Sequence, residues 1–167
     1  MIVSFALLVL FFICMIYDLR DQQVPMPLTV GGLIGAGVYA LFHGLWALIL
    51  LTIALILVSD FKSRAKRLAF AIMLVVLAMI FQPSKILIIA LVFAVWVLWE
   101  FGILGGADVK LIIAALLVLG NPLILIPISI VGGIQGVNAA LKKKKEIPFV
   151  ASIFFGTLLF VLYPYFF

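Results

Sequence analysis

The chain has 167 residues, of which 68% are hydrophobic and 10% are charged, and its formal net charge is +5. Soluble domains average roughly 45–50% apolar and about 25% charged residues. This composition excludes an ordinary soluble protein and predicts an integral membrane protein. No stretch is polar or long enough to fold separately, so residues 1–167 are expected to form one membrane domain.

Apolar runs follow one another along the chain, separated by short polar breaks in which Gly and Pro punctuate helices. Alternating β-barrel patterning is absent. We therefore expect an all-α, polytopic membrane helix bundle with about eight transmembrane helices, or six if short runs pair or re-enter. Several runs are shorter than the roughly 20 residues of a perpendicular span. The expected spans lie in residues 2–17, 28–42, 45–58, 68–81, 86–104, 111–119, 123–141 and 147–167.

The distribution of basic residues predicts the orientation of these spans. With the N-terminus outside, the segments 18–27, 59–67, 105–110 and 142–146 lie in the cytoplasm. They hold ten of the eleven Lys and Arg residues, and only Lys85 falls outside. This follows the positive-inside rule and attraction to anionic lipid, so no nucleic-acid partner is expected. Glu100, near the end of its run, can pair with a cytoplasmic Lys or Arg.

Asp18 and Asp108 each stand between an apolar run and a polar segment, on the same predicted face of the membrane. Carboxylates are costly at the edge of a bilayer, which indicates a function for them. Two carboxylates a few Å apart share one proton, and such a pair can activate a water as base and protonate a leaving group as acid. The sequence predicts that these two residues meet.

Other chemistries lack the residues they need. The only histidine, His43, lies in a turn on the predicted outer face, which disfavours a Ser-His pair. The only cysteine, Cys14, lies inside the first apolar run and is expected to be a packing residue, so neither a disulfide nor a zinc site is expected. Gly105-Gly106 lacks the spacing of a phosphate-binding loop. We expect neither a metal nor a cofactor.

Three segments carry a family resemblance. The first is Asp18-Leu19-Arg20, followed by Val24-Pro25 and Leu28-Thr29, and it resembles the first aspartate motif of the type IV prepilin peptidases. The second, Gly105-Gly106-Ala107-Asp108, is similar to the Gly-x-Gly-Asp (GxGD) signature that this family shares with presenilin-type membrane aspartic proteases. The third, Ile147-Pro148-Phe149, resembles the Ile-Pro-Phe that precedes the last helix. The matches follow the family's order and span most of the chain.

The chain also departs from the family pattern. Ala107 replaces the second glycine of the signature, and Met26 stands where the family often has Asn. Larger bacterial members carry a cytosolic loop with cysteine pairs and methylate the new N-terminus. This chain has neither that loop nor the cysteines, so it resembles the short, peptidase-only branch, the prepilin/preflagellin peptidases, without methyltransferase activity.

The resemblance implies a membrane aspartic endopeptidase, with Asp18 and Asp108 as its catalytic pair. It would remove the short basic leader of prepilin-like precursors (pilins, archaellins or pseudopilins) at the cytoplasmic face of the cell membrane. The substrate precursor and membrane lipid are the expected partners. Supporting roles fall to four residues near the aspartates: Gly105 and Gly106, which allow a substrate backbone to approach, Lys110, which anchors the loop, and Pro25.

Two further hypotheses concern the same aspartates. Asp108 opens a helix and Asp18 closes one, so the macrodipole favours Asp108 as the base and Asp18 as the proton bearer. The main rival to a peptidase is a small proton- or cation-coupled transporter, although transporters usually place their carboxylates near the bilayer midplane, often in repeated broken helices. A purely structural subunit would leave the aspartates without a purpose. Cleavage of a precursor distinguishes these possibilities.

Overall fold

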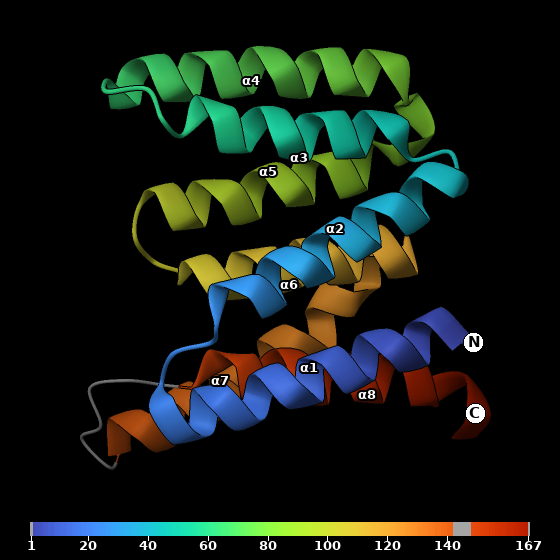
Figure 1. Ribbon diagram of the computed structural model, residues 1–167, viewed down its shortest axis with the longest axis vertical. Coiled ribbons are helices and arrows are strands. Elements are labelled where there is room, and N and C mark those ends of the chain that lie inside the picture. Colours follow the sequence, from blue (N-terminus) through green and yellow to red (C-terminus); the bar gives the residue numbers. More distant parts are fainter. Residues whose placement is uncertain (1, 142–147, 167) are drawn as a thin grey trace.

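The structure is a computed structural model that describes residues 2–141 and 148–166, with side chains described up to Tyr163. This part of the chain is all-α (Figure 1). Two short 3-10 turns, η1 and η2, lead directly into the helices that follow them. The elements are α1 (Ile2–Asp21), α2 (Met26–Phe42), α3 (Trp46–Val58), α4 (Arg64–Phe81), η1 (Pro83–Lys85), α5 (Ile86–Glu100), α6 (Gly106–Leu119), η2 (Pro122–Ile124), α7 (Leu125–Leu141) and α8 (Phe149–Phe166).

Consecutive helices run in opposite directions along the width of the molecule in Figure 1. α1, α7 and α8 form one group, α3, α4 and α5 form another, and α2 and α6 lie between the two groups. Odd-numbered helices therefore end, and even-numbered helices begin, at the left of the view. We call this side the aspartate end, because the last turn of α1 carries Asp18 and the first turn of α6 carries Asp108 there.

α6 is the central helix of the bundle. It contacts α1, α2, α5 and α8, and every residue from Leu111 to Leu117 is buried. A helix that is apolar on all sides belongs in the interior of a bundle. Its 14 residues correspond to a length of about 21 Å, less than the roughly 30 Å of a hydrocarbon core. Asp108 lies in the first turn of this helix, just before the buried run that starts at Leu111.

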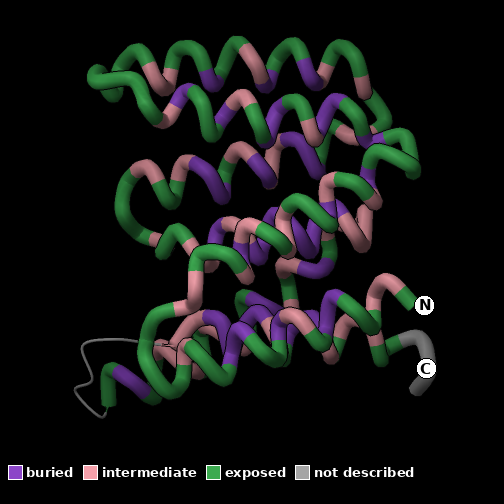
Figure 2. The backbone as a smooth tube through the Cα atoms, in the orientation of Figure 1, coloured by how far each residue is buried: buried purple, intermediate pink, exposed green. Residues whose placement is uncertain are grey.

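The outer surface of the bundle is also apolar. Figure 2 shows exposed residues along the outward sides of the helices, and large hydrophobic side chains such as Ile2, Phe42 and Ile80 are among them. Three helical segments are long and apolar enough to cross a membrane: Ile2–Asp21, Pro83–Glu100 and Pro122–Leu141. Further helices are apolar but shorter. These features are those of a multi-pass membrane helix bundle, because water solvates such a surface poorly.

The expectation of an all-α bundle is confirmed for the described residues, and each predicted apolar run there forms its own helix. Five helices (α2, α3, α4, α6 and α7) end where their runs were expected to end, whereas α1 and α5 end elsewhere, because backbone geometry and not hydrophobicity alone terminates a helix. α1 continues past its apolar run to Asp21, where Gln22 adopts a positive φ of 53°. α5 stops at Glu100 instead of residue 104, and Gly102 takes a φ of 73° just beyond it. Ile147 and Lys142–Lys145 lie outside the described residues.

Candidate active site

Asp18 continues the buried face of α1. Leu7, Phe11 and Cys14 are buried along this face, and Asp18 follows Cys14 after one helical turn. The packing of α1 against α8 and α6 therefore carries the carboxyl group inward at the aspartate end. Its Oδ2 accepts a hydrogen bond from the backbone N–H of Val150, at 3.1 Å. Val150 lies in the first turn of α8 and is 1% exposed.

Asp108 is held by its own helix. The backbone N–H of Gly105, which precedes α6, donates a hydrogen bond to Asp108 Oδ2 at 3.2 Å. This is the side-chain half of a capping box, in which the side chain of the third helical residue accepts a hydrogen bond from the backbone N–H of the residue that precedes the helix. The side chain is only partly exposed, and it stands just ahead of the buried run that begins at Leu111. The start of the central helix thus fixes the place of this carboxylate.

The two carboxylates lie close enough to interact electrostatically. Burial in the first place, and then the charge of Asp18, raise the pKa of Asp108 to about 6, whereas the Gly105 N–H acts in the opposite direction. An acid beside a second acid resists ionisation, because two negative charges repel one another. Side chains far apart in the sequence, one on α1 and one on α6, therefore come together at the same end of the bundle.

The structure changes the basis for assigning the proton between them. From the sequence, Asp18 was placed at the negative, C-terminal end of α1, and this favoured it as the proton bearer. In the structure, Asp18 also bonds to the N-terminus of α8, where the macrodipole favours the charged form. Asp108 lies at the N-terminus of α6. Both carboxylates therefore experience a positive helix end, and helix dipoles do not distinguish their roles.

The two glycines before Asp108 have different surroundings. A Cβ added to Gly105 would lie 2.8 Å from Asp108 Oδ2, whereas one added to Gly106 would be 3.6 Å from Trp99 Nε1, an ordinary contact. Space at residue 105 is thus taken up by the Asp108 carboxylate itself. The sequence-based reason for both glycines, close approach of a substrate backbone, is not required to explain Gly105.

Lys110 lies on a different face of α6 from Asp108. With Gly106 and Ile113, it lines an apolar groove of about 710 Å³ between α2, α3, α5 and α6. Two helical residues correspond to a rotation of about 200°, so Asp108 points to the opposite side of α6. The lysine therefore lines the groove and not the space beside Asp108, and its expected role in anchoring the Asp108 loop stays a prediction.

Pro25 caps the start of α2. Its carbonyl oxygen accepts a hydrogen bond from the N–H of Leu28, at 3.0 Å, and it is the residue before the first helical residue, Met26. Thr29, the last residue of the first motif, is 1% exposed and donates its hydroxyl to the Met26 carbonyl at 3.1 Å. The residues after Asp18 that carry the family resemblance therefore build the turn into α2, and within the described part of the chain no hydrogen bond joins them to either aspartate side chain.

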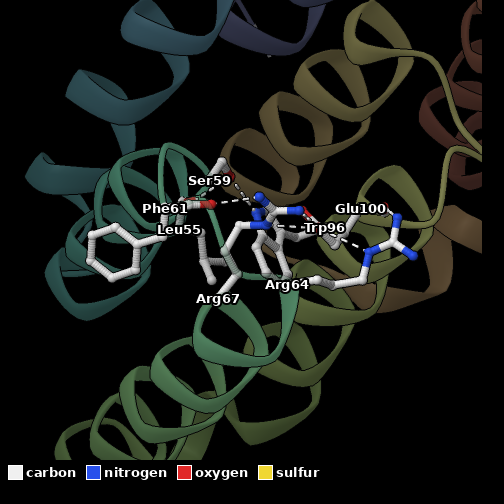
Figure 3. A network of polar contacts seen from close by, with 7 residues as sticks. All are labelled: Leu55, Ser59, Phe61, Arg64, Arg67, Trp96 and Glu100. Carbon is white, nitrogen blue, oxygen red and sulfur yellow. Dashed lines mark hydrogen bonds and ion pairs between the residues drawn. The ribbon is translucent and has the colours of Figure 1, made fainter.

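A second polar cluster at the aspartate end was only partly expected. Figure 3 shows Arg64 and Arg67 of α4 gathered around the Glu100 carboxylate of α5, whose side chain is 6% exposed. Arg67 donates from Nε at 2.8 Å and from Nη2 at 2.5 Å, and the Arg64 guanidinium lies 3.5 Å away. The expected pairing of Glu100 with a basic residue is thus observed. The two arginines of α4 compensate the negative charge of Glu100, and these ion pairs stabilise the contact between α4 and α5.

The remaining polar candidates form no bond with the aspartate pair among the described residues. Asp21 forms an exposed ion pair with Arg20 at 3.7 Å. His43 follows α2 at the opposite end of the bundle, where its ring contacts Tyr39. Within the described residues, no three His, Cys, Asp or Glu side chains are grouped in a way that could hold a metal ion.

The residue that the sequence analysis missed is Val150. Its contribution is a backbone N–H, which every residue except proline carries, so residue type gives no signal. The available indication is Pro148, because a proline at the start of a helix marks a first turn whose N–H groups have no partner within the helix. Tertiary packing decides which side chain accepts a hydrogen bond from such an N–H group.

Comparisons of the chain with protein-family models, with curated proteins and with solved structures return no match.

Proposed function

We propose that the chain is a membrane aspartic endopeptidase that removes the short basic leader from prepilin-like precursors at the cytoplasmic face of the cell membrane. The observation that carries this proposal is that Asp18 and Asp108, from two helices, lie within electrostatic range of each other at one end of the bundle. The order of the three motifs that resemble the type IV prepilin peptidases supports the choice of substrate class. Methyltransferase activity is not part of the proposal.

The proposed reaction needs one ionised and one protonated carboxyl group. The ionised aspartate takes a proton from a water, and the resulting hydroxide attacks the scissile carbonyl carbon. The protonated aspartate donates a hydrogen bond to the carbonyl oxygen and then supplies a proton to the leaving amine. Each carboxyl group uses Oδ2 for a backbone N–H, which leaves Oδ1 for this chemistry.

The proposed orientation puts the aspartate end in the cytoplasm and the N-terminus outside, with eight spans. Six described basic residues support it, since they all belong to that end: Arg20, Lys62, Arg64, Lys66, Arg67 and Lys110. A precursor anchored by its apolar helix would present its basic leader at this boundary. Anchoring raises the local concentration of the cleavage site and restricts its orientation, which contributes to the rate.

Cleavage of a prepilin-like precursor by the purified protein in lipid tests the proposal. We expect both Asp18→Asn and Asp108→Asn to reduce kcat by at least about 10³-fold, because either change removes one of the two proton carriers. Asp21→Asn is the matched control, since Asp21 lies on the same turn of α1 in an exposed ion pair, and it should cleave like wild type. Full activity in either dyad variant, with unchanged helicity, contradicts the proposal.

The transporter hypothesis is disfavoured by the position of the aspartates. Both occur within one turn of a helix end, at the proposed membrane boundary, whereas coupled transporters usually hold ions near the bilayer midplane. Proton flux into liposomes that contain the protein, abolished by the same two substitutions while no precursor is cut, would favour transport instead.

A further inference from the structure

The Asp18 carboxylate depends on a residue from the other end of the chain for its only hydrogen bond among the described residues. The donor is the Val150 N–H, 132 positions later, at 3.1 Å from Asp18 Oδ2. Val150 is buried, so water does not compete for this amide. A hydrogen bond from a buried N–H to a carboxylate is among the stronger hydrogen bonds of proteins.

The start of α8 explains why this amide is available. The first N–H groups of an α-helix have no intrahelical acceptor. In α8 the first such bond runs from the Ala151 N–H to the Pro148 carbonyl, at 3.2 Å, which leaves the Val150 N–H for a side chain. Asp18 of α1 thereby acts as a cap for a different helix.

Close packing holds the start of α8 in place. The Phe149 ring lies against Gly132 of α7, where an added Cβ would be 2.8 Å from it. One turn further, Ser152 donates to Gln135 of α7 at 2.5 Å. Deeper in the contact, a Cβ on Gly156 would lie 2.5 Å from the backbone of Ile128. The donor therefore has little freedom to move relative to α7, and α8 also packs against α1.

We propose that the Val150 N–H is the positioning group of Asp18: it holds Oδ2 and directs Oδ1 toward Asp108 and the reacting water. This inference rests on the proposed peptidase function, and it adds α8 to the elements that the reaction requires. The arrangement repeats the one at Asp108, where the Gly105 N–H holds Oδ2 at 3.2 Å. Two helix N-termini, of α6 and α8, would thus set the geometry of the pair.

Among the described residues, few other titratable groups face Asp18. Asp108 of α6 and Cys14 of α1 interact with it electrostatically. α2 contributes only Tyr39 and the described side chains of α8 contribute only Tyr163, both near the opposite end of the bundle. A change in the pH dependence that follows removal of the Val150 N–H, and not removal of the Ala151 N–H, is therefore assigned to the aspartate pair.

An amide-to-ester replacement at Val150, introduced as the corresponding α-hydroxy acid, removes this N–H and keeps the side chain. We expect kcat to fall about 10- to 100-fold with KM within about twofold, because one charge-assisted hydrogen bond is lost at the pair. The acid limb of the rate–pH profile should move up by about one pH unit, since the lost donor stabilised the ionised form. The matched control is an ester at Ala151, whose N–H bonds to Pro148 and not to Asp18.

A second pair of variants tests the same donor by ordinary mutagenesis. Val150→Pro removes the N–H at a first-turn position that tolerates proline, and Val150→Ala keeps the N–H while removing the same side-chain packing. The acid limb should move in the proline variant and stay in place in the alanine variant. Equal limbs in both variants, or in both esters, overturn the inference even when kcat falls, because a loss of packing lowers activity without changing proton affinity.

A measurement without a substrate separates this inference from the proposed function. The infrared carboxyl band that is lost in Asp18→Asn reports the protonation of Asp18, and its titration midpoint should rise in the Val150 ester and not in the Ala151 ester. If wild type cleaves precursors and the midpoint does not move, the positioning role fails and the peptidase proposal stands. If wild type cleaves nothing and the midpoint moves, the peptidase proposal fails and the role of the amide in holding Asp18 stands.

Discussion

At the scale of single residues, each aspartate has one oxygen held by a backbone amide. The donors, Val150 N–H and Gly105 N–H, lie at the starts of two different helices. Backbone donors cannot rotate away as side chains do, so they fix a carboxylate at low entropic cost. The positions of α6 and α8 therefore determine how the two carboxylates are oriented, and two predictions at single residues follow.

The first prediction concerns Asp108 and the stability of the fold. The pKa of Asp108 is about 6 in the folded protein, above its ordinary value of 3.8. Between these values the folded state keeps a proton that the unfolded state releases, so stability rises as the pH falls toward 4 and this contribution is lost as the pH rises through 6. We expect Tm in detergent, followed by tryptophan fluorescence, to rise when the pH is lowered from 7 to 5.

Two variants control this prediction. Asp108→Asn resembles the protonated form, so its Tm should vary less with pH than that of wild type over the same range. Asp21→Asn should keep the full dependence, because Asp21 is exposed. An unchanged slope in Asp108→Asn would show that the carboxyl group ionises alike in the folded and unfolded chain.

The second prediction separates two explanations for the glycines. If the Asp108 carboxylate itself fills the space beside residue 105, Gly105→Ala should displace it and reduce kcat for cleavage about tenfold or more, whereas Gly106→Ala should have a smaller effect. If substrate approach is the reason, both variants should raise KM. Gly31→Ala, which has open space beside it, serves as the control for a glycine-to-alanine change in a helix.

At the scale of elements, the α4–α5 contact depends on a compensated charge. The Glu100 carboxylate is almost fully buried, and Arg67, at 20% exposure, is its closest partner, whereas Arg64 is 56% exposed. The network continues through the Trp96 indole N–H, which donates to Ser59 Oγ at 3.1 Å. These bonds tie the segment before α4 to the end of α5 at the aspartate end (Figure 3).

We expect Arg67→Ala to destabilise the protein by about 1–3 kcal/mol, because it leaves a buried carboxylate without its two-point donor. Arg64→Ala should cost less, since the exposed guanidinium is screened by water. Lys66→Ala, at an exposed neighbouring position, should be close to neutral. Thermal unfolding in detergent measures the order of the three variants, and an equal effect of Arg64→Ala and Arg67→Ala would contradict it.

At the scale of the whole molecule, the alternation of helix directions puts all described basic residues except Lys85 at one end. The opposite end holds the turn at His43 and the η1 turn, which are joined by a bond from Gln82 Nε2 to the Gly44 carbonyl at 2.5 Å. A membrane protein with this asymmetry is expected to place its basic end in the cytoplasm.

Single-cysteine labelling in cells tests this orientation. In a Cys14→Ala background, which removes the buried native thiol, His43→Cys and Ser84→Cys should react with a membrane-impermeant maleimide from outside. Ser63→Cys should react only after the membrane is permeabilised, because it lies at the aspartate end. The reverse pattern would place the aspartate pair outside and exclude cytoplasmic leader cleavage.

The amino-acid sequence by itself determined the class of protein and the approximate extent of its helices. Both follow from local properties, because apolar runs partition into lipid and Gly, Pro and polar breaks end helices. It also singled out Asp18 and Asp108, since charge is rare in such a chain and costly at the bilayer edge. Their proximity, the Val150 donor and the burial of Glu100 were decided only by the tertiary structure. Each depends on which helices become neighbours. Packing between residues far apart in the sequence decides this, so no single segment of the sequence predicts it.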